Sequence, residues 1–233
     1  MSSPDFKVLF EDTHLVVLDK PAGLLSQGGD LGGRQGGASE PNLVDLLRVH
    51  FGRNYVGLIH RLDRNTSGLM VVAKRTKSAQ RLTDSLKNGT LKRSYLAILT
   101  GWVAEKQGIW TDTLLKNPKT NEVTVVKKGT PESKEAQLNF ECLKNFEFKK
   151  QKLSLMRFVL ETGRSHQIRV QAQARGYPLL GDPKYGAATG EGPKLNRLAL
   201  HSAGLEFPHP MSAQLLTFDC PLPEELAVMT SKS

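Results

Sequence analysis

The amino-acid sequence predicts an α+β fold, with a central mixed, mostly antiparallel β-sheet in two abutting halves and flanking helices. Two observations support this prediction. Strand-like runs of branched and aromatic residues are grouped along the 233-residue chain, and helical patterns are inserted singly between the groups. The sequence shows neither an internal repeat nor a clear interdomain linker, so we expect one compact domain over residues 1–233.

The N-terminal region contains the first expected strands. FKVLF (6–10) and LVVLD (15–19) flank EDTH, a pattern typical of a β-hairpin. LMVVA (69–73) is a run of apolar and branched residues, which predicts a buried strand. Residues 27–41 contain three glycine pairs, and glycine this dense predicts a flexible loop.

Two helices are expected in the same region. NLVDLLRVHF (42–51) places leucines at helical spacing after Asn42, which we expect to be the N-cap. TKSAQRLTDSLKNG (76–89) predicts a second helix, capped by Thr76 and stopped by Gly89. We expect its apolar face to turn inward and its basic face to solvent or phosphate; these faces are Ala79, Leu82 and Leu86, and Lys77, Arg81 and Lys87.

The remainder of the chain is rich in strand patterns. They are SYLAILTG (94–101), GIWTDTLL (108–115), EVTVVKK (122–128), EAQLNFECL (135–143), LSLMRFVLE (153–161) and AQLLTFD (213–219). One further helix is expected within TGRSHQIRVQAQARG (162–176), with Ser165 as its cap. The Gly- and Pro-punctuated GYPLLGDPKYG that overlaps its end predicts a loop.

The charge balance is unusual for a chain of ordinary composition. There are 32 Lys and Arg residues against 23 Asp and Glu residues, which gives a net charge of +9. Residues 74–93 hold seven basic residues and a single acidic one, Asp84. Such a surplus favours a polyanionic partner, either nucleic acid or an anionic membrane surface, although it also serves solubility.

Other classes of protein are disfavoured. No apolar run approaches the ~20 residues needed to span a bilayer, and the acidic N-terminus lacks the apolar core of a signal peptide. Cys142 and Cys220 lie outside any C-x-x-C spacing, so we expect reduced thiols in a cytoplasmic protein. The six histidines show neither H-x-x-x-H nor H-E-x-x-H spacing, so we expect no metal site. A paired-carboxylate hydrolase stays open, because its second carboxylate can lie anywhere in the sequence.

HRLDRNTSG (60–68) holds one carboxylate, Asp63, between Arg61 and Arg64, on the connection between two apolar segments. Nearby cations favour the ionised form of a carboxylate, and an ionised carboxylate can attack a sugar carbon or an electron-poor ring. The alternative is a structural Asp–Arg pair that fastens the loop. Taken alone, these nine residues favour the structural pair.

TGRSHQIR (162–169) is a second polar stretch, in which Arg164 and Arg169 are separated by a little more than one helical turn. An arginine at a helix start can hold a phosphate, and a deeper one can hold Asp63 by a bidentate contact. A solvated helix face is the alternative for this stretch considered alone.

The motifs occur together and in order, and on them the chain resembles the RluA-type family of RNA pseudouridine synthases. VLFEDTHLVVLDKPAGLL, HRLDRNTSGLMVVAK, KRSY, LETGRSHQIRVQAQARGYPLLGDPKYG and LALHSAGLEFPHP are similar to its signatures, from about Phe6 to Asp219. The resemblance implies the pseudouridine synthase fold, with an active-site cleft between the halves of the sheet. It also implies isomerisation of uridine within RNA, replacing the N1–C1′ bond by a C5–C1′ bond. This reaction needs no redox cofactor, group donor or metal.

The resemblance also assigns roles to residues. Asp63 matches the nucleophile, and attack at C1′ of the ribose or at C6 of the uracil are both open. Tyr95 matches a tyrosine that lies against the uracil and is proposed to shuttle a proton. Arg169 matches the arginine that pairs with the aspartate, and Arg61 matches one that helps to displace the target base. The residues expected to contact RNA are Arg61, Arg64, Arg164, His166, Lys77, Arg81, Lys87, Lys92 and Arg93.

The expected partner is ribosomal or transfer RNA, without a membrane, and the protein is expected to be a monomer. Many relatives carry an N-terminal RNA-binding domain of the S4 type, for which we expect no room before Phe6. Two other functions remain: a catalytically silent RNA-binding relative of the same fold, and a nucleoside or glycoside hydrolase that uses Asp63.

Overall fold

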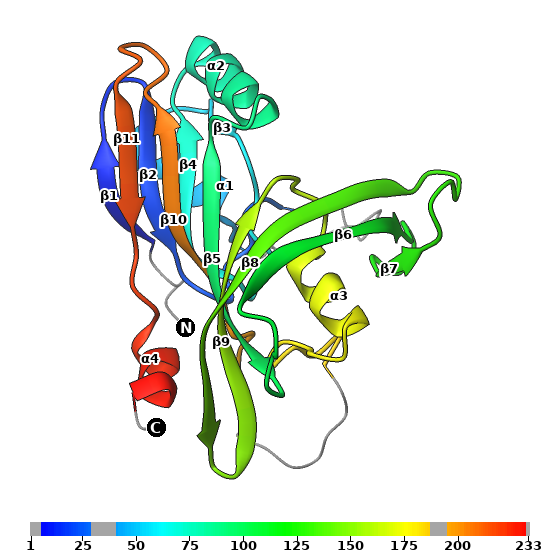
Figure 1. The fold of residues 1–233 in the computed structure, drawn as a ribbon. Helices are drawn as coiled ribbons and strands as arrows, with labels where there is room; N and C mark the ends of the chain where they lie inside the picture. Colours follow the sequence, from blue (N-terminus) through cyan, green and yellow to red (C-terminus); the bar gives the residue numbers. More distant parts are fainter. Residues whose placement is uncertain (1–5, 29–40, 187–194, 232–233) are drawn as a thin grey trace, which may run out of the picture. The chain divides into compact units, whose positions relative to one another are not determined.

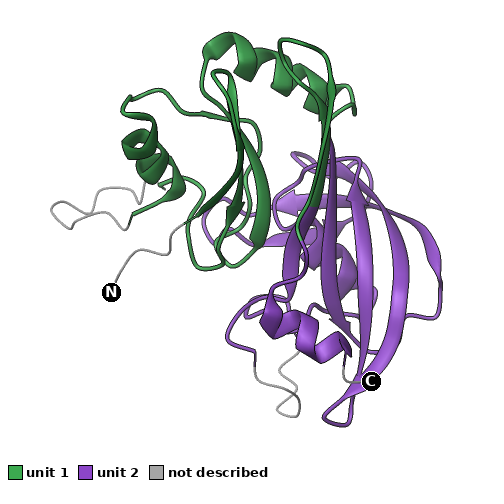
Figure 2. Ribbon diagram, turned by 90° about the vertical axis from the view of Figure 1, so that its left-hand side faces the viewer, with its two compact units in different colours: residues 1–91, 204–220 green, residues 92–203, 221–233 purple. Residues whose placement is uncertain are grey.

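The structure is a computed structural model that describes residues 6–28, 41–186 and 195–231 (Figure 1). The chain divides into two compact units (Figure 2). Unit 1 comprises Met1–Leu91 and Gly204–Cys220, and unit 2 comprises Lys92–Ala203 and Pro221–Ser233. The single domain expected over residues 1–233 stays a prediction, and most of the predicted loop 27–41 lies outside the described residues.

Unit 1 is built on short strands. They are β1 (Lys7–Glu11), β2 (Leu15–Lys20), β3 (Gly57–Leu58), β4 (Ser67–Ala73), β11 (Leu215–Asp219) and the last residues of β10 (Leu200–Pro208). The order is β1-β2-β4-β10, with β3 paired to β4 and β11 to β10. The pairs β1–β2, β2–β4, β3–β4 and β10–β11 are antiparallel. The predicted N-terminal hairpin is confirmed, because β1 and β2 pair antiparallel with Lys7 opposite Asp19.

The helices of unit 1 lie where the sequence predicts them, with one corrected cap. Helix α1 (Leu43–Phe51) begins after Asn42, whose side chain accepts a hydrogen bond from the backbone N–H of Asp45 at 3.3 Å. Helix α2 (Thr76–Lys87) has Arg75 as its N-cap without a side-chain capping bond. The expected Thr76 cap is therefore wrong: Thr76 is already the first helical residue, one position beyond the N-cap, from which a side chain bonds the N–H groups of the first turn.

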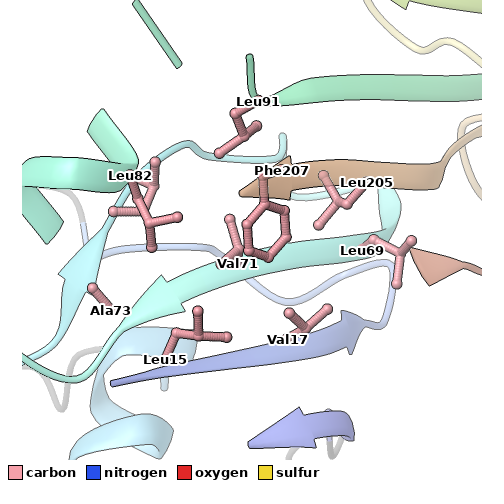
Figure 3. Packing of buried hydrophobic residues seen from close by; sticks show 10 residues of the cluster. Leu15, Val17, Leu69, Val71, Ala73, Leu82, Leu91, Leu205 and Phe207 are labelled. Carbon is pink, nitrogen blue, oxygen red and sulfur yellow. The ribbon is translucent and has the colours of Figure 1, made fainter. Parts of the chain in front are cut away.

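The core of unit 1 lies between its sheet and α2. Leucine and valine side chains alternate along β2 and β4, and they pack with residues of β10 and α2 (Figure 3). The central members are Leu15, Val17, Leu69, Val71, Leu82, Leu205 and Phe207, all fully buried or nearly so. Leu82 confirms the predicted inward face of α2, with Ala79 and Leu86 packed against the same cluster.

Unit 2 contains the longer strands. They are β5 (Lys92–Thr100), β6 (Gln107–Lys116), β7 (Val123–Val126), β8 (Lys134–Phe148), β9 (Gln151–Leu160) and the first residues of β10. Their order is β10-β5-β9-β8-β6-β7, and the pairs β5–β9, β8–β9, β6–β8 and β6–β7 are antiparallel. The strand predictions between residues 94 and 161 are confirmed, and so is the α+β fold with a mostly antiparallel sheet.

Two helices complete unit 2, α3 (Gln167–Ala174) and α4 (Glu224–Ser231). The expected Ser165 cap of α3 is wrong. The N-cap is His166, in the left-handed conformation at φ 51°, and it makes no side-chain capping bond. Instead, the side-chain oxygen of Gln167 accepts bonds from the Arg164 N–H at 3.0 Å and from the Thr162 hydroxyl at 2.8 Å. The turn before α3 is therefore closed by the side chain of Gln167, the first residue of the helix, and not by Ser165.

Candidate active site

Asp63 lies in the loop between β3 and β4 and is partly exposed. The preceding residue, Leu62, is buried, and the hydroxyl of Ser26 bonds both of its backbone groups. Ser26 donates to the Leu62 carbonyl at 2.7 Å and accepts from the Leu62 N–H at 3.1 Å. The Asp63 carbonyl accepts from the Thr66 N–H at 3.1 Å, which closes a turn directly after the carboxylate. Asp63 therefore projects from a loop that is fixed on both sides.

A fully buried lysine also supports this loop. The ammonium of Lys20, at the end of β2, donates to the carbonyls of Leu24 at 2.8 Å, Pro21 at 2.9 Å and Arg64 at 3.2 Å. Arg64 returns a bond from its Nε to the carbonyl of Gly23 at 3.0 Å. The segment after β2 and the loop that carries Asp63 are thus joined through backbone groups, as burial of a lysine requires.

The two arginines beside Asp63, Arg61 and Arg64, differ in how they are used. Both side chains are exposed. Arg64 is directed to the backbone of Gly23, so part of its donor capacity serves the loop itself. The expected role of Arg61, which is to help displace the target base, stays a prediction.

Tyr95 lies on β5 in unit 2, opposite Phe158 of β9, with 5% of its surface exposed. Arg93, two residues earlier, shares its face of the strand and is 6% exposed. The Arg93 guanidinium packs on Gly163: a Cβ added there would lie 2.8 Å from Nη1. Arg93 therefore lies below the surface, and a phosphate contact would require its side chain to leave Gly163.

Arg169, on the first turn of α3, forms a bidentate ion pair with Asp182. Its Nε and Nη2 atoms donate to Oδ2 and Oδ1, each at 2.8 Å. The Asp182 side chain is fully buried, and that of Arg169 is 9% exposed. Burial alone would raise the pKa of Asp182, but the bonds and charge of Arg169, with the N–H groups of Tyr185 and Lys184, lower it below its ordinary value. Asp182 is therefore held as an anion.

Aromatic and imidazole groups surround this ion pair. The Arg169 Cζ lies 5.0 Å from the centre of the Tyr185 ring, a cation–π distance. The Tyr185 hydroxyl lies 2.7 Å from Nδ1 of His166 and accepts from the Val123 N–H at 2.9 Å. His166, expected to contact RNA, is thus bonded to the side chain that covers Arg169.

The remaining basic residues are distributed over both units. Lys77, Arg81 and Lys87 are exposed on α2, as predicted, although Arg81 donates to the carbonyl of Pro210 at 2.6 Å. In unit 2, Lys92 is exposed, and the exposed Arg164 donates through Nε to the carbonyl of Glu135 at 2.8 Å. Within the described ranges, no group of three His, Cys, Asp or Glu side chains is placed to hold a metal ion. In the same residues, no helix has both the length and the apolar composition to cross a membrane.

The sequence analysis names some residues of this candidate site and misses the residues that support them. Asp63 belongs to unit 1, whereas Tyr95 and Arg169 belong to unit 2. The sequence assigns no role to Lys20, Ser26, Asp182 or Tyr185. All four lie in or beside KPAGLL and GDPKYG, stretches that match the family signatures but contain no titratable pair at a recognisable spacing.

Comparison with known proteins identifies the family. The model for "RNA pseudouridylate synthase" matches residues 14–174. The chain is 36% identical to ribosomal large subunit pseudouridine synthase D of Nitrosomonas europaea, over 96% of this chain and 64% of the relative. It is 34% identical to an uncharacterized RNA pseudouridine synthase of Bacillus subtilis, over 96% and 71% of the two chains. It therefore spans about two thirds of the length of these relatives.

A solved structure agrees with the fold. The human RNA pseudouridylate synthase domain containing 1 superposes with a TM-score of 0.77 at 22% identity, covering 97% of this chain and 89% of that one. The family model extends over the Asp63 loop, the Tyr95 strand and the helix of Arg169, and the fold agrees over nearly the whole chain. The chain thus belongs to the RNA pseudouridylate synthase family.

Proposed function

We propose that this protein converts uridine to pseudouridine within a structured RNA, ribosomal or transfer. The observation that carries the proposal is the Asp63 loop: a partly exposed carboxylate on a backbone fastened by Ser26 and Lys20, inside the segment that matches the family model. Such a fixed carboxylate suits nucleophilic catalysis, because a reacting group must be held close to its productive geometry.

In the proposed reaction, the carboxylate of Asp63 attacks the uridine, at C1′ or at C6, and the N1–C1′ bond breaks. The base rotates and C5 forms a new bond to C1′. The bond between Asp63 and the substrate breaks, which returns the free carboxylate. The proton on C5 then leaves to solvent, and a solvent proton is taken up at N1. No water is consumed, so product and substrate have the same mass. Tyr95 is proposed to transfer a proton during rearrangement, and Arg169 to stabilise the reacting carboxylate.

The target base must leave its stack before it can react, at a cost of about a few kcal/mol. We propose that Arg61 occupies the vacated space and that exposed basic side chains bind the neighbouring phosphates. These are Lys77, Arg81, Lys87, Lys92, Arg64 and Arg164, and the half-buried His166 is proposed as a further contact. Phosphate contacts of this kind supply affinity that depends on salt concentration.

The Nitrosomonas europaea relative is named for the large ribosomal subunit, and this favours ribosomal over transfer RNA as the substrate. We propose a cytoplasmic monomer. Light scattering of the purified protein and fractionation of the source cell test these two points.

Release of tritium from RNA labelled at C5 of uridine tests the function directly. The proposal expects release with the wild-type protein and a pseudouridine of unchanged mass in the digested RNA. RNA binding without release would establish the silent relative instead. Free uracil or sugar among the products would establish a hydrolase. Pseudouridine maps of cells with and without the gene would then identify the substrate.

A further inference from the structure

The guanidinium of Arg169 is fixed in direction as well as in place. A guanidinium carries five N–H donors in one plane. The bidentate pair with Asp182 uses one on Nε and one on Nη2, at 2.8 Å each. The Nη1 donors and the second Nη2 donor therefore point away from Asp182. The position of the Asp182 carboxylate thus determines where these donors are directed.

Asp182 is itself held by the turn in which it lies. Its Oδ1 also accepts from the backbone N–H groups of Lys184 at 2.9 Å and Tyr185 at 3.0 Å. Its carbonyl accepts from the Gly186 N–H at 3.0 Å, and a Cβ on Gly186 would lie 2.3 Å from that carbonyl oxygen. Backbone groups on both sides therefore set the orientation of the carboxylate before any substrate binds.

Tyr185 restricts the guanidinium from a second direction. The Arg169 Cζ lies 5.0 Å from its ring centre, so one face of the guanidinium is covered. The Tyr185 hydroxyl is fastened to the Val123 N–H and to His166. An arginine side chain has many rotamers and loses entropy when ordered. Here the contacts with Asp182 and Tyr185 supply that ordering.

From this geometry we propose that Asp182 is a positioning residue that acts through Arg169. It fixes the orientation of the guanidinium, and with it the direction of the donors that Asp182 does not use. The inference rests on the proposed function, in which Arg169 stabilises the reacting carboxylate, and it adds the residue that makes this arginine effective. A misplacement of about 1 Å can cost on the order of 100-fold in rate. A guanidinium that is held in the wrong orientation should therefore slow the reaction.

Asp182→Asn is the appropriate variant. The asparagine keeps Oδ1, which accepts from the two backbone N–H groups of the turn, so the turn is preserved. Its NH2 group replaces Oδ2 and faces the Nε–H donor of Arg169, which removes the bidentate pair. We expect kcat to fall on the order of 100-fold, while the dissociation constant for RNA stays unchanged.

The chain offers a matched control in Asp112→Asn. Asp112 accepts from Nη1 of Arg175 at 2.8 Å, and Arg175 directly follows α3. Both variants remove one carboxylate that pairs with an arginine of the same region, but Asp112 accepts from Arg175 and Gln171 and not from Arg169. We expect Asp112→Asn to lower the melting temperature without lowering kcat. An equal loss of kcat in both variants, in proportion to their melting temperatures, would overturn the proposal.

A double variant distinguishes a positioning role from a structural one. If Asp182 acts through Arg169, then Arg169→Lys with Asp182→Asn should be no slower than Arg169→Lys alone. A further loss on the order of 100-fold in the double variant would contradict the inference.

A measurement without RNA separates this inference from the proposed function. In the wild-type protein the Arg169 Nε–H should exchange slowly with solvent by NMR, and Asp182→Asn should accelerate it whereas Asp112→Asn should not. Unchanged exchange in Asp182→Asn would refute the positioning role whatever the RNA assay gives. If exchange responds as expected but the wild-type protein makes no pseudouridine, the proposed function fails and the orienting contact stands.

Discussion

The hydroxyl of Ser26 bonds both the N–H and the carbonyl of Leu62, the residue immediately before Asp63. One small side chain, 4% exposed, thus satisfies two buried backbone groups of the loop that carries the proposed nucleophile. Because buried backbone groups without partners are costly, this contact determines the path of the loop.

Ser26→Ala should therefore lower both stability and activity. Leaving the Leu62 groups without this partner should cost about 1–3 kcal/mol in the free energy of unfolding, measured by urea denaturation. Ser78→Ala is the matched control, because Ser78 is fully buried and its hydroxyl has no hydrogen-bond partner in the described part of the chain. Equal destabilisation by the two variants would show that the Ser26 bonds contribute nothing.

Asp63→Asn should abolish turnover while RNA affinity and melting temperature stay close to those of the wild type. The amide keeps the size of the side chain but is not a nucleophile. Tritium release, RNA binding and thermal unfolding should be measured on the same preparation. Asp84→Asn, on α2, is the control with the same change of charge, and it should retain turnover. An Asp63→Asn protein that unfolds, with activity lost in proportion, would restore the structural-pair interpretation.

Replacing Lys77, Arg81 and Lys87 by Gln should weaken RNA binding and reduce its dependence on salt. Each lost phosphate contact should reduce the slope of log K against log salt concentration by about 0.7–0.9. The control variant replaces Lys127, Lys128 and Lys134 by Gln. These three lysines are exposed in unit 2, so the variant loses the same charge at another place. Equal slopes in the two triple variants would contradict a binding surface on α2.

The ion pair of Asp182 should make stability depend on pH in acid. Its pKa in the folded protein lies below the ordinary value of 3.8. Its contribution is therefore complete above that ordinary pKa and is lost as the pH falls through the lower folded pKa. The difference in unfolding free energy between wild type and Asp182→Asn should be constant from neutral pH to about pH 5 and shrink below pH 4. A difference that grows on acidification would have the wrong sign.

Gly163→Ala should displace Arg93, since the new Cβ would lie 2.8 Å from its Nη1. The contact is with the far end of a long side chain, so the guanidinium can shift and we expect a cost below the ~1–3 kcal/mol of overpacking a rigid core. We expect slower turnover because Tyr95 shares the strand face of Arg93. Arg93→Lys shortens the head group and should restore part of the stability in the Gly163→Ala background. If Arg93→Lys does not restore stability, the stability cost of Gly163→Ala does not arise at Arg93.

The sequence predicts the fold better than it predicts the contacts that support the candidate site. Strands with branched residues and the Asn42 cap follow local rules, and they are confirmed. Strand β10 and helix α4 are not predicted: β10 contains Gly204 and Ser202 within a weak pattern, and α4 buries few side chains. The caps of α2 and α3 also differ from prediction, because a Thr or Ser near a helix start does not fix which residue adopts non-helical angles.

The supports of the site depend on contacts between distant residues. Ser26 and Leu62 are 36 positions apart, and Lys20 reaches the carbonyl of Arg64 across 44. Both separations are longer than any single helix or strand of the chain, so the periodicity of one element cannot reveal these contacts. Asp182 is 13 positions from Arg169, and its role depends on the turn that presents its carboxylate.

Strand β10 begins in one unit and ends in the other, and β11 follows it into unit 1. As the ribosome synthesises the chain, unit 1 must therefore wait for more than a hundred further residues before β4 acquires its partner β10. Until then a largely apolar strand edge is open to pairing with other chains. Truncation before residue 204 should accordingly yield an aggregating nascent fragment rather than a smaller, independently folded enzyme.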